Sequence, residues 1–262
     1  MSDAVLYSSS ERIGVITLNR PEARNAVNRD VALGLEAAVD RLEDDPDVWV
    51  GVLVANTGEQ DRPVFCAGAD LKVLAEAGDA RSLATARGGF AGFVYRERTK
   101  PIVVAVDGLA TAGGLEIVLA ADIAVATTRS AFGLAEVTRS IIAGAGGLFR
   151  LPRAVGRAVA MDAILTGEPI DARRAYELGL VSRLVEPGDA SAEALHVAQR
   201  IVAAGPLAVR ASRRVVLAAA QHDDEALQQL SEELLGAVMA TEDFREGVTA
   251  FAEKRAPRWT GR

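Results

Sequence analysis

The chain has little of the chemistry on which many enzymes depend. Its 262 residues include one cysteine, Cys66, and two histidines, His196 and His222. A single cysteine cannot form an intrachain disulfide, which favours a reducing, cytoplasmic location. Neither histidine has a serine or cysteine motif beside it, so an exposed position on a helix is favoured over a catalytic role.

Several familiar motifs are also missing. No G-x-S-x-G elbow, Walker loop or G-x-G-x-x-G turn occurs, so the sequence does not indicate a serine hydrolase or a nucleotide-binding loop. The run 222–224 lacks ligand spacing on one helix face, and we expect no metal site. The most apolar region, 102–126, is interrupted by Asp107, Glu116 and Asp122, a pattern unlike a membrane span.

The chain lacks an excess of positive charge. Its formal net charge is −7, whereas non-specific nucleic-acid binding needs Lys and Arg to displace phosphate counterions. We therefore expect neither a nucleic-acid partner nor a membrane partner. A small anionic ligand remains compatible with this charge, because a few local basic groups suffice for one phosphate.

The first two-thirds of the chain alternates strand-like and helical patterns. Asn28 is placed to cap a helix with apolar positions Val31, Leu35, Ala38 and Leu42 on one face. A second, short helix is expected near 113–121. This alternation predicts an α/β fold, with strands at 13–18, 48–54, 64–66, 102–106 and 123–126.

The last third of the chain is helical throughout. This region is expected to pack on the α/β body or on another subunit. Its helices are predicted at 158–165, 171–178, 191–203, 207–220, 224–239 and 241–254.

Two segments of small residues stand at strand-to-helix junctions, at 65–72 (FCAGADLK) and 108–116 (GLATAGGLE). Small residues let a ligand approach the backbone closely, and the free N–H groups at a helix start favour a developing anion. Two such donors aimed at one carbonyl oxygen would form an oxyanion hole. The alternative for each segment is a tight turn with no function.

Glu116 and Glu136 are the two candidate catalytic carboxylates that accompany these junctions. Glu116 follows Gly113 by one helical turn in an otherwise apolar stretch, and Glu136 closes the run FGLAE. A surface position is the alternative for Glu116. For Glu136 the alternative is a structural salt bridge, for instance with Arg139.

A set of motifs resembles the enoyl-CoA hydratase/isomerase (crotonase) superfamily, in the family's order and over nearly the whole chain. The matching runs are LNRPEARNAVN (18–28), FCAGADLK (65–72), GGLE (113–116), FGLAEV (132–137), GAGG (144–147) and EGVTAFAEKRAP (246–257). The separation between Glu116 and Glu136 also resembles the hydratase pattern.

The resemblance implies a spiral of ββα units followed by a C-terminal helical region for trimerisation. The expected division is a spiral core with the active site at 1–195 and a helical region at 196–262 that completes the CoA site. The expected assembly is a homotrimer or a dimer of trimers.

By the same resemblance, the N–H groups of Ala69 and Gly113 form the oxyanion hole for a thioester carbonyl. Glu116 and Glu136 are then the catalytic pair that hydrates a 2-enoyl-CoA, with Glu136 giving a proton to C2 and Glu116 acting on water. CoA enters with the substrate, and no separate cofactor is expected. An isomerase, a carnitinyl-CoA-type dehydratase, a CoA-thioester hydrolase and a non-catalytic acyl-CoA-binding protein remain alternatives.

The resemblance also suggests how the acyl-CoA is held. The expected CoA-binding residues are Arg24, Ala67, Asp70, Leu71, Lys72 and Lys254, the last sometimes acting on a neighbouring subunit. Candidates for the acyl pocket are Phe90, Phe93, Phe132 and Arg139, with Tyr95 nearby. Ordinary core packing is the alternative for the aromatic residues, and a solvated surface charge is the alternative for the basic ones.

Overall fold

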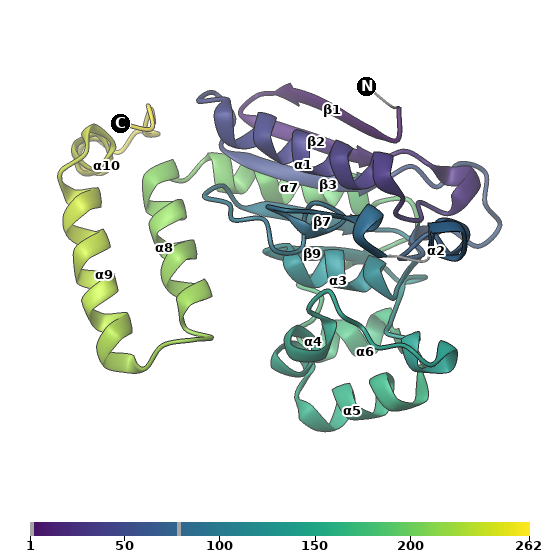
Figure 1. Cartoon of the computed structure of the whole chain (residues 1–262). Helices are drawn as coiled ribbons and strands as arrows, with labels where there is room; N and C mark the ends of the chain where they lie inside the picture. Colours follow the sequence, from purple (N-terminus) through teal and green to yellow (C-terminus); the bar gives the residue numbers. More distant parts are fainter. Residues whose placement is uncertain (1–2, 78–79) are drawn as a thin grey trace.

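A computed structural model describes residues 3–77 and 80–262 and has a six-stranded sheet at its centre (Figure 1). Only the first pair of strands is antiparallel, and every later neighbour in this sheet is parallel. In spatial order the strands are β1 (Val5–Ser10), β2 (Ile13–Leu18), β3 (Val50–Ala55), β7 (Ile102–Val106), β9 (Ile123–Thr127) and β12 (Arg183–Val185).

The strands of a second, smaller sheet alternate along the chain with those of the first. Each of the strands β3, β7 and β9 is followed along the chain by a strand of the small sheet, and these pair in the same order as their predecessors. This repetition is the spiral of strand pairs that the sequence resemblance implies. The small sheet is ordered β11 (Ile170–Asp171), β10 (Ala131–Gly133), β8 (Leu109–Thr111) and β4 (Val64–Cys66).

The large sheet is buried on both faces, which explains the unbroken apolar run of β7. Val103 and Ala105 pack with helix α7 (Ala190–Val202), whereas Val104 and Val106 belong to the larger core on the opposite face. Successive side chains of a strand point to opposite faces, so a strand covered on both sides must be apolar at every position.

Helix α1 (Arg29–Asp44) covers the first strands of this sheet. The Asn28 side chain accepts a hydrogen bond from the N–H of Val31 at 3.0 Å, so the predicted N-cap is confirmed. Its predicted apolar face, including Leu35 and Leu42, is fully buried. The helix therefore begins where its capping residue and its apolar periodicity together require.

The C-terminal end of α1 is held by a buried lysine. Lys100 is only 2% exposed, and its ammonium donates to the carbonyl oxygens of Leu42, Glu43 and Asp45 at 2.6, 3.1 and 2.6 Å. The last carbonyls of a helix have no partner within it. Lys100, which stands just before β7, thus joins α1 to the central sheet.

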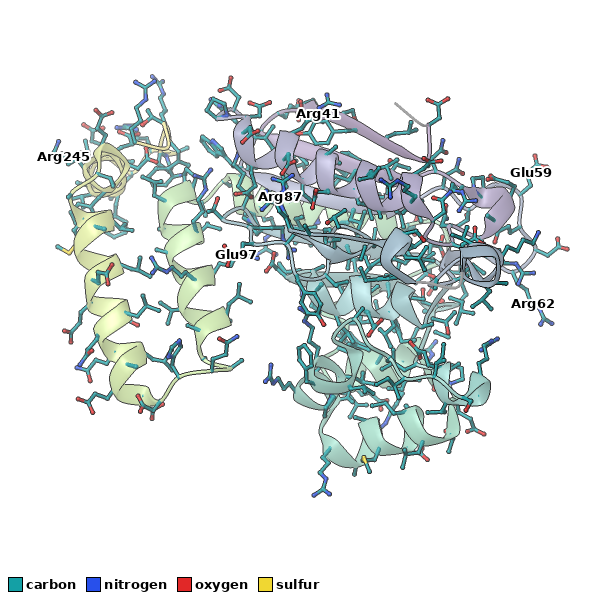
Figure 2. The ribbon with its side chains drawn as sticks, in the orientation of Figure 1. Arg41, Glu59, Arg62, Arg87, Glu97 and Arg245 are labelled. Carbon is teal, nitrogen blue, oxygen red and sulfur yellow. The ribbon has the colours of Figure 1, made fainter. Side chains whose placement is uncertain are left out.

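A two-stranded hairpin, β5 (Ala84–Thr85) and β6 (Gly89–Phe90), is fastened to α1. Arg87, labelled in Figure 2, pairs with Asp40 and donates to Glu36 at 3.3 Å. The Thr85 hydroxyl also donates to Glu36. These contacts fix the hairpin, which carries Phe90, relative to the sheet.

The remaining helices form two groups. A cluster of α4 (Gly147–Val155), α5 (Arg157–Thr166) and α6 (Ala172–Glu177) lies below α3 (Gly113–Ala120) in Figure 1. A lobe at the side of the body consists of α8 (Pro206–Ala218), α9 (Asp224–Met239) and α10 (Glu242–Glu253). Short elements complete the chain: α2 (Leu71–Ala77) and the 3-10 turns η1 (Pro21–Ala23), η2 (Ala80–Leu83) and η3 (Glu136–Arg139).

The expected division between residues 195 and 196 falls inside α7. Ala194, Val197 and Ala198 are all buried in the core between α7 and the sheet, so α7 belongs to the body along its length. The separate lobe begins with α8, after α7 has ended. The physical reason is that the apolar face of α7 continues past residue 195.

Several elements have no counterpart among the predictions from sequence, among them β1, β8, β10 and α4. The strands β8 and β10 have three residues each, too short for a periodic pattern, and β1 is an edge strand with mostly exposed side chains. Helix α4 contains Pro152. Among the described residues, no helix has both the length and the apolar character to cross a membrane.

Replacing Lys100 with Met is expected to lower the free energy of unfolding by about 2–4 kcal/mol, because three carbonyl oxygens at the end of α1 lose their donor. Urea denaturation followed by circular dichroism measures this change. The exposed Lys72, replaced in the same way, should change stability by less than about 0.5 kcal/mol. Equal midpoints for the two variants would show that Lys100 does not cap α1.

Candidate active site

The pairing of the small sheet brings the candidate residues together. Strand β8 lies between β4 and β10 and is parallel to both, with Ala110 opposite Cys66 and Thr111 opposite Gly133. Parallel strands end at the same edge of a sheet. The segments that follow, which carry Ala69, Gly113, Glu116 and Glu136, therefore converge at one edge.

The segment after β4 is held by the chain just before α1. Val27 donates to the Gly68 carbonyl at 2.7 Å and accepts from the N–H of Asp70 at 2.9 Å. These bonds leave the intervening Ala69 N–H unused within the described part of the chain. The amide of Gly113 stands at the first position of α3, where a helix leaves its N–H groups without an internal partner.

Glycines allow these two segments to touch. A Cβ added at Gly68 would lie 2.8 Å from the amide nitrogen of Gly113. One added at Gly113 would lie 2.4 Å from the Phe90 ring, and one at Gly114 would lie 2.1 Å from the Cys66 carbonyl oxygen. The junction at 113–114 is therefore restricted to glycine by contact, and the Ala69 and Gly113 amides lie on adjacent segments.

Ala112 precedes this junction in a strained conformation. Its φ of 51° and ψ of −128° lie where a side chain is disfavoured, at a cost of about 1–3 kcal/mol. Its N–H donates to the Gly133 carbonyl at 2.8 Å, which holds the turn against β10. The strain is the cost of turning β8 sharply into α3 and exposing the N–H of Gly113.

Glu116 is a buried carboxylate fixed by backbone donors. It lies in the first turn of α3, is 3% exposed, and its Oε1 accepts from the N–H groups of Ala145 and Gly147 at 2.7 and 2.9 Å. Burial raises the pKa of this carboxyl, while the two hydrogen bonds and the more distant Arg150 oppose the rise. The side chain is thus held in one position, with Oε2 free for a further contact.

Glu136 is buried in a less polar setting. It is 7% exposed, and within the described residues its Oε2 has no hydrogen-bond partner. Burial raises the pKa of Glu136 to about 7; its own backbone N–H and Arg139 oppose the rise, and the charge of Glu116 adds to it. Of the two carboxyls, Glu136 is the one suited to carry a proton near neutral pH. No salt bridge joins Glu136 to Arg139 among the described residues.

A cavity of about 880 Å³ opens over these groups. Both glutamates and both amide-bearing residues line it, beside the Phe90 ring of the anchored hairpin. The wall is otherwise mainly apolar and includes Leu71, Leu83, Tyr95, Leu109, Ile141 and Ile142. A cavity of this size with a few convergent polar groups is typical of a small-molecule site.

Some of the expected ligand-binding residues lie at this cavity. Arg24, Ala67 and Leu71 line it, as do Phe90 and Arg139. The Arg24 carbonyl accepts from the N–H of Ala67 at 3.1 Å, so the first two are neighbours. The structure therefore brings together residues from segments far apart in the sequence.

Other expected CoA-binding residues lie elsewhere. Asp70 pairs with Arg20 at 3.2 Å, and Lys72 is exposed without lining the cavity. Lys254 ends α10 in the separate helical lobe (Figure 1), so one chain alone does not bring it to the cavity. The ion pair with Arg20 gives Asp70 a structural role.

Phe93 and Phe132 correct the expectation for the acyl pocket. Both side chains are fully buried in the main core and neither lines the cavity. Phe93 packs under the guanidinium of Arg98, 4.8 Å from the ring centroid, and Phe132 belongs to β10 with Ala110 beside it. Both are core residues, the alternative that ordinary packing offers for aromatic side chains.

The backbone donors to Glu116 have no counterpart among the sequence predictions. Ala145 and Gly147 belong to the GAGG run, which enters only as a matching motif. A Cβ at Gly147 would lie 3.2 Å from Cγ of Glu116 and 2.8 Å from Leu134, so glycine permits the close approach. The glycine run itself was the available signal, since glycine marks a close approach of the backbone.

Cys66 lies beside the site without taking part in it. The side chain is fully buried, and burial raises the pKa of the thiol to about 12. A thiol of this kind is not a nucleophile at neutral pH. Among the described residues, no cluster of His, Cys, Asp or Glu has the arrangement of a metal site.

The matched family agrees with this geometry. The model of the family described as "Enoyl-CoA hydratase/isomerase" matches residues 8–262. The chain belongs to the enoyl-CoA hydratase/isomerase family. The match covers every element that builds the cavity, so the family assignment applies to the site as well as to the sheets.

Individual members of the enoyl-CoA hydratase/isomerase family match along their whole length. A relative named (E)-benzylidenesuccinyl-CoA hydratase, from Thauera aromatica, is 38% identical over 98% of this chain and 99% of its own. Crotonyl-CoA hydratase from Syntrophomonas wolfei is 35% identical over 96% and 95%. The crystal structure of an enoyl-CoA hydratase from Mycobacterium tuberculosis H37Rv superposes with a TM-score of 0.92 at 43% identity, covering 100% of both chains.

Gly113→Ala is expected to lower kcat for an enoyl-CoA thioester by about 10²–10³, because the added methyl group collides with Phe90 and displaces an amide donor. Steady-state kinetics measures the loss, and thermal unfolding checks that the variant is folded. Gly236→Ala is the matched control, since a Cβ there has no heavy atom within 4 Å. Equal activity of the two variants would show that a Cβ at position 113 does not displace the amide, and that contact with Phe90 does not restrict this position to glycine.

Proposed function

We propose that this chain is an enoyl-CoA hydratase that adds water across the 2,3 double bond of a 2-enoyl-CoA thioester. The observation that carries the proposal is the unequal surroundings of Glu116 and Glu136 beside two free amide donors. One carboxylate is fixed by hydrogen bonds, and the other is poised to hold a proton. The relatives named as hydratases support this reaction class.

The amide donors act on the thioester. Attack of water at C3 moves electron density through C2 to the thioester oxygen, which becomes enolate-like. The N–H groups of Ala69 and Gly113 would stabilise this charge, and Gly113 adds the positive end of the α3 dipole. Donors held by the backbone need little reorganisation during the reaction.

The two glutamates divide the proton transfers. The water oxygen bonds to C3 while Glu116 accepts a proton from that water. Glu136 gives its own proton to C2. The product is the 3-hydroxyacyl-CoA, and one water has been added in total. Return of the proton from Glu116 to Glu136 restores the enzyme. Both carboxyls line one cavity, and we expect them to act on the same face of the double bond, which gives syn addition.

The CoA part of the substrate extends from the amide donors towards Arg24. Ala67 and Leu71 line the same part of the cavity, and their small and apolar side chains suit contact with the pantetheine arm. Arg24 would pair with a phosphate group. The proposed reaction uses only protein groups, so CoA enters as part of the substrate and no separate cofactor is needed.

The alternatives keep the same donors but use the carboxylates differently. A double-bond isomerase needs one group to move a proton between C2 and C4. The two backbone bonds that orient Glu116 favour a second task, the positioning of water. A non-catalytic acyl-CoA-binding role would leave the raised pKa of Glu136 without a use.

The proposed assembly is a homotrimer or a dimer of trimers. The helical lobe carries exposed large apolar side chains on three successive helices, among them Val216, Leu235 and Phe251. Exposed apolar surface of this kind marks a protein interface. In such an assembly a neighbouring subunit would bring Lys254 to the CoA phosphates.

The proposed location is the cytoplasm. Cys66, the single cysteine, is a free buried thiol. A chain without disulfides is compatible with a reducing compartment. The CoA thioesters proposed as substrates would have to be present in the same compartment.

Hydration of crotonyl-CoA by the purified protein tests the function, followed as loss of the enoyl-thioester absorbance. Glu116→Gln and Glu136→Gln should each lower kcat by about 10²–10⁴, the usual contribution of general acid or base groups. Glu233→Gln, on the exposed surface of α9, is the control. If the wild type is inert on short, medium and branched enoyl-CoAs, the hydratase proposal is wrong.

The rate of hydration should also fall as the pH rises through about 7, because Glu136 then loses the proton that it gives to C2. At low pH the rate falls again, since Glu116 becomes protonated and no longer accepts a proton from water. The measurement is kcat/KM for crotonyl-CoA between about pH 5 and 9. A profile that stays flat up to the alkaline end would exclude Glu136 as the proton donor.

A further inference from the structure

Arg139 stands one turn beyond the acidic residue of the site. Glu136 and Arg139 are the first and last residues of η3, and both line the cavity. Side chains three residues apart on a 3-10 helix lie one above the other, and the backbone rises by roughly 6 Å between them. Arg139 therefore lines the cavity about one turn of backbone away from the carboxyl that is proposed to reach C2 of a bound thioester.

The guanidinium has no carboxylate partner among the described residues. Its only hydrogen bonds are weak ones from Nη1, to the Ala135 carbonyl at 3.5 Å and to the Thr138 hydroxyl at 3.2 Å. An arginine side chain has five N–H donors, so most of its capacity is unused. Arg150, the other arginine near Glu116, is by contrast occupied by the carbonyl oxygens of Ala145 and Val94.

The wall next to Arg139 is apolar. Ile141 and Ile142 follow it after Ser140, and both line the cavity although 49% and 71% of their surfaces remain exposed. Tyr95 lies on the same wall, with its hydroxyl 3.3 Å from the Gly144 carbonyl. An apolar wall beside an arginine without a carboxylate partner fits a hydrocarbon chain that ends in a carboxylate, because the planar guanidinium matches a carboxylate fork. Arg24, the other arginine at this cavity, is the one proposed for a CoA phosphate.

We propose that Arg139 selects acyl-CoA substrates whose acyl chain ends in a second, free carboxylate. The turnover of such a substrate rests on the proposed hydratase function, whereas its binding does not. Arg139 thus determines the substrate class, and Glu136 on the same turn carries out the proton transfer. The exposed position of Arg139 limits the expected preference to about fivefold, because solvent and salt screen the ion pair.

Binding of saturated thioesters tests the selection without turnover. Isothermal titration calorimetry with hexanedioyl-CoA and hexanoyl-CoA gives the ratio of the two dissociation constants. The wild type should bind hexanedioyl-CoA about fivefold more tightly, and Arg139→Gln should reduce this ratio to about one. Arg139→Lys, which keeps the charge, should retain part of the ratio. Arg173→Gln, an exposed arginine outside the cavity lining, should not change it.

Two further readouts separate the possible outcomes. The preference should weaken between about 50 and 500 mM salt if it comes from charge, a result that a purely structural role of Arg139 would not produce. A ratio that is the same in wild type and Arg139→Gln overturns the inference. If the ratio behaves as expected but neither the corresponding neutral nor carboxylated enoyl-CoA is hydrated, the hydratase proposal fails and the selection by Arg139 stands.

Discussion

The parallel pairing of β4, β8 and β10 is the constraint on which the rest of the site depends. These strands have three residues each, yet their register decides which backbone groups meet at the edge of the small sheet. The pairing also explains why glycine stands at positions 68 and 114, because an added Cβ there would collide with the neighbouring segment. A shift of one residue in this sheet would separate the amide donors from the carboxylates without changing any side chain.

The two glutamates of the site have the same chemistry, but their surroundings affect their pKa values differently. Glu116 and Glu136 are both buried glutamates, but only Glu116 accepts hydrogen bonds from the GAGG segment. Desolvation acts on both, and the hydrogen bonds compensate for it at one of them. The difference in proton affinity therefore originates in a loop that never touches the reacting carbons.

The sequence was informative where a pattern extends over many residues. The capped helix after Asn28, the buried strand at 102–106 and the C-terminal helices follow from periodicity and capping, and the structure contains all of them. The ordered motifs pointed to the family and to both glutamates. The three-residue strands β8 and β10 are fixed by contacts between distant segments. The GAGG run marks a close approach of the backbone, but the local pattern does not show that Glu116 is the residue approached.

The aromatic residues illustrate the same limit. Phe90 and Phe93 are close in sequence and similar in chemistry, yet one lines the cavity and the other is buried in the core. Which of them faces a ligand depends on how the hairpin β5–β6 packs on α1, through Arg87 and Glu36. Residue type alone cannot distinguish the two positions.

The proposed use of main-chain amides as the anion-stabilising donors has a consequence for mutational tolerance. A donor that belongs to the backbone is present whatever side chain the codon specifies, so most substitutions at position 69 leave an N–H in place. Proline is the exception, because it alone removes the hydrogen. On this proposal the chemistry at the thioester is insulated from most single-codon changes at position 69, while the cavity-lining side chains of Arg139, Ile141 and Ile142 can change without removing either amide donor.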